Sequence, residues 1–167
     1  IEEFPSECVQ SISCTTRKPR KGEIDGKDYV FLTKEAFDKR VKQGEFLEHA
    51  LVFGEDYGTL KTIVDSQRES GKHVILVIDT QGALALKKSE DALFIFISPP
   101  SYDILKERLK KRKTEEEPIQ EERLKWASFE MERAKYYDYL VVNDDLETAY
   151  QVLKSILVAE SHRVKKK

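Results

Sequence analysis

Two arginines stand three residues apart in S-C-T-T-R-K-P-R, where Arg17 and Arg20 flank Pro19. Arginine presents a planar fork of N–H donors that matches phosphate oxygens, and it stays charged at physiological pH. Held by the proline, the two side chains could converge on one phosphate, to which Tyr29 just beyond the loop could add a hydroxyl donor. The alternative is a solvated basic loop, because such pairs are common on protein surfaces.

Glu48 in E-F-L-E-H-A offers a different chemistry. A carboxylate only accepts hydrogen bonds, and it can take two N–H groups side by side. Guanine presents such a pair at N1 and N2, whereas adenine does not. If this glutamate is buried, we expect it to select guanine and to reject a base without these donors by roughly 10⁴-fold. The alternative is an ordinary surface glutamate.

Further hydroxyl groups and a second carboxylate follow along the chain. In Tyr57-Gly58-Thr59 the two hydroxyls could serve phosphate and base, and Gly58 permits a close approach of the backbone. The same residues could instead form a turn that caps a helix. Asp79 follows an apolar run. Because ligands of open α/β sheets bind at the carboxyl ends of strands, we expect this carboxylate in a site.

Arginines recur in the second half of the chain. Arg108 and Arg112 are four residues apart on one predicted helix and share a face, and Arg123 follows on the next helix. Phosphoryl transfer needs positive charge at the transferred group, and a lid that carries arginines would supply it while excluding water. The run 106–113 holds six basic residues, so a nucleic-acid patch is the alternative. The slightly acidic chain disfavours that alternative.

Apolar periodicity indicates the elements that hold these side chains. Strands are predicted at 9–13, 29–32, 73–78, 92–97 and 139–142, and one or two strands are predicted within 46–53. Helices are predicted at 34–43, 59–70, 81–88, 101–113, 118–134 and 146–157, with Thr33 and Thr59 as N-caps of the first two. Alternating strands and helices from residue 73 onward predict a parallel α/β sheet with strands buried on both faces. Residues 14–70 are expected to form an insertion with its own small sheet.

The bulk composition is that of one soluble domain. Of 167 residues, 40% are hydrophobic and 36% are charged, and 29 basic against 31 acidic side chains give a net charge of −2. This balance disfavours nucleic acid and membrane surfaces as partners. The longest apolar runs are far shorter than the roughly 20 residues of a membrane span. Two cysteines without metal spacing predict no disulfide framework and no metal ligand set, and we expect a cytoplasmic protein.

Taken in order, these motifs resemble the guanylate kinase family. The matching segments are S-C-T-T-R-K-P-R-K-G-E-I-D-G-K-D-Y-V-F, G-E-F-L-E-H-A-x-x-F-G-x-x-Y-G-T, I-D-T-Q-G-A, P-P-S and V-V-N-D-D-L. The first two are the most specific, and the similarity covers nearly the whole chain. The resemblance implies one α/β domain over residues 1–167 with a P-loop NTPase-type parallel sheet core flanked by helices. An inserted small mixed-sheet region at 14–70 would bind GMP, and a helical lid would occupy 101–134.

The resemblance also implies a reaction and its residues. ATP would phosphorylate GMP to GDP by in-line transfer, with Mg²⁺ carried on the ATP and no side chain acting as a covalent nucleophile. The implied GMP site comprises Ser13, Arg17, Arg20, Tyr29, Glu48, Tyr57, Gly58, Thr59 and Asp79. The implied ATP site comprises Arg108, Arg112, Asn143 and Asp144. The implied catalytic arginines, which stabilise the transferring phosphoryl group, are Arg20, Arg108, Arg112 and Arg123.

Three features depart from the family pattern. The phosphate-binding loop G-x-x-x-x-G-K-[ST] does not occur in the 167 residues. The family places this loop about 20 residues before the position of Ser13, where this sequence has 12 residues. We interpret the N-terminus as disordered or deleted, and we expect negligible kinase activity from a chain that begins at Ile1. Val77 replaces a usually acidic residue, and K-K-R-K replaces a glycine-containing lid sequence, which predicts a different lid flexibility.

Two other function classes are alternatives. Catalytically inactive guanylate-kinase-like modules bind phosphorylated peptides through the former GMP site, and they would tolerate the missing loop. Such a module does not need Arg108, Arg112 and Arg123 in register. A basic RNA-binding protein is disfavoured by the net charge and by the lack of a basic sheet motif interleaved with aromatic residues. The sequence does not indicate an oligomeric state.

Overall fold

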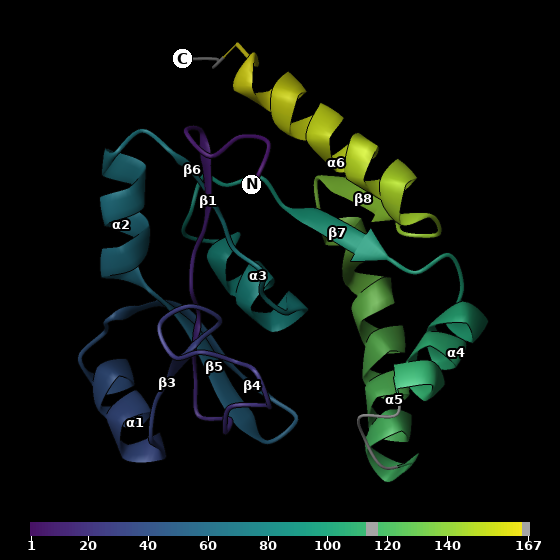
Figure 1. The fold of residues 1–167 in the computed structure, drawn as a ribbon, viewed down its shortest axis with the longest axis horizontal. Helices are drawn as coiled ribbons and strands as arrows, with labels where there is room; N and C mark the ends of the chain where they lie inside the picture. The colour runs from purple at the N-terminus through teal and green to yellow at the C-terminus, as the bar shows by residue number, and fades with distance from the viewer. Residues whose placement is uncertain (113–116, 165–167) are drawn as a thin grey trace. The chain divides into compact units, whose positions relative to one another are not determined.

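The computed structural model describes residues 1–112 and 117–164, without the side chains of residues 112 and 117–119. The chain forms two compact units, Ile1–Asp91 and Ala92–Lys167 (Figure 1). Both units combine helices with short strands, as the predicted α/β class requires. The residues predicted to bind GMP lie in the first unit, and those predicted to bind ATP lie in the second.

A parallel pair of strands opens the first unit. β1 (Cys8–Gln10) pairs with β6 (His73–Ile75). The parallel pairing is as predicted, but both strands are shorter than the predicted runs 9–13 and 73–78. Burial on both faces was wrong, since Ile97, Leu140 and Val142 of the later predicted strands are exposed. In the second run of this pair, His73 is exposed and no residue of 73–78 is buried. The strand stops at Ile75, and Val77 in the following segment is 70% exposed.

A four-stranded mixed sheet makes up the middle of the first unit, with the strand order β3-β2-β5-β4. Its strands are β2 (Cys14–Thr15), β3 (Val30–Phe31), β4 (Phe46–Val52) and β5 (Glu55–Leu60). β2 and β3 run parallel, whereas β5 is antiparallel to both β2 and β4. The small mixed sheet predicted within residues 14–70 is therefore confirmed.

The helices beside this sheet begin in two different ways. α1 (Lys34–Lys42) starts after Thr33, whose hydroxyl accepts a hydrogen bond from an N–H of the first turn at 3.2 Å, as predicted. α2 (Lys61–Glu69) has Leu60 as its N-cap and no side-chain cap. The prediction that Thr59 caps this helix is wrong. Thr59 belongs to β5, where its hydroxyl has a buried partner.

Apolar side chains pack α1 onto the mixed sheet. The buried members of this core are Cys14, Phe37, Phe46 and Leu60. The Phe37 and Phe46 rings stack with their centroids 4.5 Å apart. Burial raises the pKa of the Cys14 thiol to about 11, so this cysteine stays protonated at neutral pH and behaves as a core residue. The core fixes β4 and β5, the strands that carry Glu48 and Thr59.

The last helix of the first unit, α3 (Thr80–Leu86), begins at a carboxylate. Asp79 is its N-cap, and its Oδ1 accepts a hydrogen bond from the Gly82 N–H at 2.9 Å. α3 packs against β4 of the mixed sheet. This packing brings the turn after β6 next to the strand that carries Glu48.

The second unit pairs β7 (Ile95–Ser98) with β8 (Tyr139–Val142) in parallel. The segments between and after these strands form α4 (Tyr102–Arg112), α5 (Glu117–Arg133), the 3₁₀ turn η1 (Ala134–Tyr136) and α6 (Leu146–Ser161). Parallel strands joined through helices confirm the alternation predicted from the sequence. The last helix lies against β8 (Figure 1).

One face of α6 packs against β8. The buried residues of this core are Val141, Ala149 and Ile156, with Leu93, Ile95 and Tyr139 packed around them. Asp145 caps the helix by accepting a hydrogen bond from the Thr148 N–H at 2.8 Å. Within the described part of the chain, no helix has the length and apolar character needed to cross a membrane.

Candidate functional site

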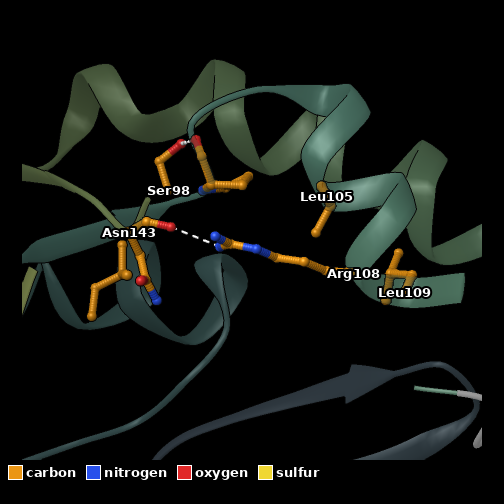
Figure 2. Close-up of a pocket in the computed structure, with 7 residues that line it drawn as sticks. Ser98, Leu105, Arg108, Leu109 and Asn143 are labelled. Carbon is orange, nitrogen blue, oxygen red and sulfur yellow. Dashed lines mark hydrogen bonds between the residues drawn. The ribbon is translucent and has the colours of Figure 1, made fainter. Parts of the chain in front are cut away.

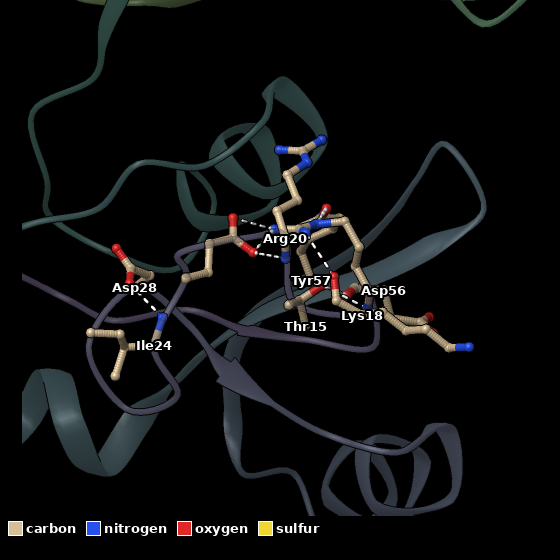
Figure 3. Close-up of polar contacts among 9 residues, drawn as sticks. Thr15, Lys18, Arg20, Ile24, Asp28, Asp56 and Tyr57 are labelled. Carbon is tan, nitrogen blue, oxygen red and sulfur yellow. Dashed lines mark hydrogen bonds and ion pairs between the residues drawn. The ribbon is translucent and has the colours of Figure 1, made fainter. Parts of the chain in front are cut away.

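A polar cluster in the first unit surrounds Arg17, and Figure 3 shows its neighbours Lys18 and Tyr57. Its Nη2 donates to both carboxylate oxygens of Glu23 at 2.8 and 3.0 Å, and its Nη1 donates to the carbonyl of Lys18 at 2.8 Å. Its Nε donates to the Tyr57 hydroxyl at 3.3 Å. The Arg17 side chain is only 13% exposed. Its guanidinium is therefore held in one orientation by groups of the protein.

Two tyrosines complete this cluster. The Arg17 guanidinium lies 5.4 Å from the centre of the Tyr29 ring, a distance that allows a cation–π interaction. The Tyr29 and Tyr57 rings meet edge to face, with centroids 6.1 Å apart. The structure thus brings together three of the residues that sequence analysis assigned to the phosphate. The alternative of an unstructured basic loop does not describe Arg17.

Glu23 ties the two arginines of the loop together. Its Oε2 accepts a hydrogen bond from the Arg20 backbone N–H at 2.6 Å, in addition to the pair with Arg17. The hydrogen bond from Arg17 lowers the pKa of the Glu23 carboxyl, and the same bond raises the pKa of Arg17. The Arg20 side chain is exposed and extends away from the cluster (Figure 3).

Glu48 is a buried carboxylate. It is 6% exposed, and its Oε1 accepts a hydrogen bond of 2.6 Å from the hydroxyl of Thr59, which has no exposed surface. Burial raises the pKa of Glu48, the Thr59 hydrogen bond opposes this rise, and the negative charge of Asp79 adds to it. The alternative of an ordinary surface glutamate is therefore wrong.

Both carboxylate oxygens of Asp79 accept hydrogen bonds from the first turn of α3. Oδ1 accepts from the Gly82 N–H at 2.9 Å, and Oδ2 accepts from the Gln81 side-chain amide at 3.1 Å. The same amide of Gln81 donates to the Leu51 carbonyl in β4 at 3.2 Å. These bonds connect the strand end, the helix start and the mixed sheet, and they hold Asp79 within electrostatic reach of Glu48.

The other residues predicted for GMP are arranged around the same strands. Ser13 is half-buried just before β2, and its carbonyl accepts from the Val30 N–H at 3.0 Å. Gly58 is buried opposite Cys14. A methyl group at Gly58 would come within 2.9 Å of the Phe46 ring. Tight packing therefore accounts for the glycine at this position.

The second unit has a pocket of about 270 Å³ at the carboxyl ends of β7 and β8 (Figure 2). Its lining residues are Ile97, Ser98, Pro99, Leu105, Arg108, Leu109 and Asn143. Arg108 donates from Nη1 to the Asn143 carbonyl at 2.7 Å and from Nη2 to the Asp144 carbonyl at 3.1 Å. These bonds clamp α4 to the loop that follows β8. The pocket lies where ligands of parallel sheets bind.

The other two predicted arginines of the second unit lie on α4 and α5. The backbone of Arg112 ends α4, but its side chain lies outside the described part of the structure. Residues 113–116 of the predicted lid, 101–134, lie outside it as well. Arg123 is half-buried on α5, one residue before the buried Leu124.

Comparison with known proteins shows the family to which the chain belongs. The family model for guanylate kinase matches residues 1–160. The guanylate kinase of Protochlamydia amoebophila is 53% identical over 167 residues, which cover 100% of this chain and 84% of that protein. The chain belongs to the guanylate kinase family. The predicted resemblance is thus confirmed, and the family identifies the protein as a nucleoside monophosphate kinase.

Other guanylate kinases give the same result. That of Chlamydia felis is 46% identical over 162 residues, which cover 97% of this chain and 79% of that protein. The crystal structure of guanylate kinase from Anaplasma phagocytophilum superposes with a TM-score of 0.83 at 36% sequence identity, over 98% of this chain and 81% of that chain. The guanylate kinase fold, a P-loop NTPase fold, is therefore confirmed as well.

Sequence reasoning missed three residues of this candidate site. Glu23 was one charge in a charged loop, and its pairing with Arg17 depends on the path of that loop. Gln81 and Gly82 appeared only as letters of the segment I-D-T-Q-G-A. A usable signal was Gly82 itself, because a glycine inside a helix costs about 1 kcal/mol relative to alanine and calls for a reason.

Proposed function

We propose that this guanylate kinase family member transfers the γ-phosphoryl group of ATP to GMP, and that its first unit binds the GMP. The observation that carries the proposal is the buried carboxylate of Glu48. A carboxylate with so little exposed surface needs hydrogen-bond donors, and Thr59 supplies one. Guanine N1–H and N2–H would supply two more. Thr59 and Ser13 would line the base beside Glu48.

This arrangement would exclude adenine. AMP has no N1–H, and its amino group is not placed to form a side-by-side pair of donors. Binding AMP would leave the buried carboxylate of Glu48 without the partners that it gains from guanine. Sites built for hydrogen bonds reject analogues that lack them by roughly 10⁴-fold.

The GMP phosphate would bind at the Arg17 cluster. Arg17 is oriented by Glu23 and stacked over Tyr29, and the hydroxyls of Tyr29 and Tyr57 are suited to donate to phosphate oxygens. Arg20 follows on the same loop with an exposed side chain that can reach an anion. Gly58 and Asp79 complete the proposed GMP site.

The second unit would bind ATP. The pocket lined by Arg108 and Asn143 has the polar and apolar lining typical of nucleotide-base sites, and Asp144 follows directly. A GMP phosphate oxygen would attack the γ-phosphorus in line, and the bond to the β-phosphate oxygen would break, so that ADP leaves. Arg20, Arg108, Arg112 and Arg123 would stabilise the charge that develops on the transferred group.

Mg²⁺ is proposed to arrive with ATP. In the described residues, no group of three or more His, Cys, Asp or Glu side chains could hold a metal ion. Mg²⁺ often has few protein ligands, because it is held by substrate phosphates and water with one or two carboxylates. Asp79 is the carboxylate of this site that could face it. When bound, the ion neutralises part of the phosphate charge.

The phosphopeptide-binding alternative fits Glu48 less well. A phosphopeptide could use the Arg17 cluster, since its phosphate has the same chemistry. It would offer no guanine edge to Glu48, and a carboxylate of 6% exposure without matched donors is destabilising. The buried glutamate therefore favours a guanine nucleotide over a peptide.

A coupled assay of the full-length gene product tests the proposal. ATP is supplied with GMP, AMP or UMP, and the formation of ADP is followed. We expect turnover with GMP and kcat/KM values lower by about 10³-fold or more with the other two nucleotides. Turnover with AMP as good as with GMP would contradict the role of Glu48. Binding of GMP without turnover would favour the non-catalytic alternative.

A further inference from the structure

Gly82 has no local conformational reason to be a glycine. It lies within α3 and is not among the glycines with positive φ, which are Gly22, Gly26, Gly44, Gly54 and Gly71. At a helical φ, alanine fits the backbone and favours the helix, whereas glycine weakens it. The sequence thus breaks a local rule at this position, and such exceptions are expected at functional sites.

The reason lies in a side chain 34 positions earlier in the sequence. A methyl group on Gly82 would overlap Oε2 of Glu48, and it would lie 3.1 Å from the Cδ of the same side chain. Asp79 Oδ1 would be 3.4 Å away, an ordinary van der Waals contact. Gly82 is buried, so the methyl group would have no open space in which to point.

The opposite side of the Glu48 carboxylate is occupied as well. Its Oε1 accepts the hydrogen bond from Thr59 at 2.6 Å, and Thr59 is completely buried in β5. The carboxylate therefore sits between a hydroxyl on one strand and the bare backbone of Gly82. A displacement from Gly82 would disturb the Thr59 bond or turn the plane of the carboxylate.

We propose that Gly82 is a specificity-determining positioning residue, whose missing side chain lets the Glu48 carboxylate take the orientation that recognises guanine. The inference rests on the proposed function, because it assumes that Glu48 contacts the base. Gly82 acts through Glu48 rather than on the nucleotide. The atoms that alanine would displace are the free end of a side chain, so the carboxylate moves while the fold stays intact.

The test compares GMP with IMP, which lacks the N2 amino group and so loses one of the two donors. Affinities are measured by titration calorimetry for the parent protein, Gly82→Ala, Glu48→Asp and the double variant. We expect Gly82→Ala to weaken GMP binding by about tenfold or more and to reduce the preference for GMP over IMP. Ala85→Gly is the matched control, because it changes the helix propensity of the same helix at an exposed position.

The double variant shows whether Gly82→Ala acts by displacing the Glu48 carboxylate or by disturbing the protein elsewhere. Glu48→Asp withdraws the carboxylate by one methylene and makes room for the methyl group that Gly82→Ala introduces. We expect the double variant to bind GMP at least about threefold better than the product of the two single effects predicts. Additive effects would overturn the inference. So would a folded Gly82→Ala protein whose GMP affinity and GMP/IMP preference stay within about twofold of the parent.

Folding is followed by circular dichroism and urea unfolding. If Gly82→Ala does not fold and the double variant does, steric contact with Glu48 is supported. If neither folds, Gly82 acts through packing of the backbone and the inference is overturned. A parent protein without preference for GMP over AMP would refute the proposed function itself. If the parent prefers GMP over AMP and Gly82→Ala binds GMP and IMP as the parent does, only the inference about Gly82 fails.

Discussion

The ionised form of the Glu48 carboxyl is unfavourable in the folded protein, although this group is proposed to bind guanine. Its carboxylate is 6% exposed, has one hydroxyl donor and lies within reach of the charge of Asp79, so its pKa is raised. A group whose folded pKa is raised binds its proton more tightly in the folded state. The carboxyl therefore stabilises the fold below its unfolded pKa. The stability is lost as pH rises towards its folded pKa.

We predict that Glu48→Gln stabilises the protein at neutral pH. Glutamine is neutral like the protonated acid and can still accept the hydrogen bond from Thr59. The difference in the free energy of unfolding between variant and parent should be near zero in acid, grow as pH rises through the raised pKa, and then stay constant. Urea unfolding between pH 4 and 8 measures it. A variant that is less stable at neutral pH would contradict the prediction.

Glu23 is a second residue whose charge has a specific use. It orients Arg17 and binds the Arg20 N–H. We predict that Glu23→Gln weakens GMP binding by roughly tenfold, because Arg17 loses a charge-assisted hydrogen bond and becomes free to rotate. Calorimetric titration with GMP measures the loss, with the exposed Glu69→Gln as the matched control. Tighter GMP binding would instead show that Glu23 competes with the phosphate for Arg17.

At the scale of the elements, short sequence motifs predicted helix caps correctly where both hydrogen-bond partners are close in the sequence. Thr33 was predicted as an N-cap, and its hydroxyl accepts from the turn that it begins. Thr59 carries the same signal and was assigned wrongly, because the stronger acceptor, Glu48, comes from a neighbouring strand. The contact of Gly82 with Glu48 and the pair of Glu23 with Arg17 depend on tertiary structure and were likewise missed.

The clamp between α4 and the loop after β8 gives an element-scale prediction. Arg108 donates to two carbonyls from its two Nη atoms, and the single ammonium nitrogen of lysine cannot reproduce this planar fork. We predict that Arg108→Lys lowers the free energy of unfolding by about 1 kcal/mol and raises the KM for ATP about fivefold. The KM for GMP should stay unchanged, because the GMP residues lie in the other unit. Equal changes in both KM values would contradict this division.

At the scale of the whole molecule, the two substrates are assigned to different units. The residues proposed for guanine and phosphate lie within residues 1–91, and the pocket with Arg108 and Asn143 lies within residues 92–167. The sequence predicted one domain with the GMP motifs ahead of the lid, and it did not predict the boundary after residue 91. It could not predict which motif residues orient others, since those pairs join distant segments. Membership of the guanylate kinase family identifies the reaction, which uses both substrates.

The central claim is that Glu48 selects guanine. The most direct measurement is kcat/KM for GMP and for AMP, with ATP as the donor, in the full-length parent protein and in Glu48→Gln. We predict that the variant loses about 10²–10³-fold with GMP and changes little with AMP, although it is the more stable protein at neutral pH. A variant that keeps the preference of the parent for GMP over AMP would contradict the account.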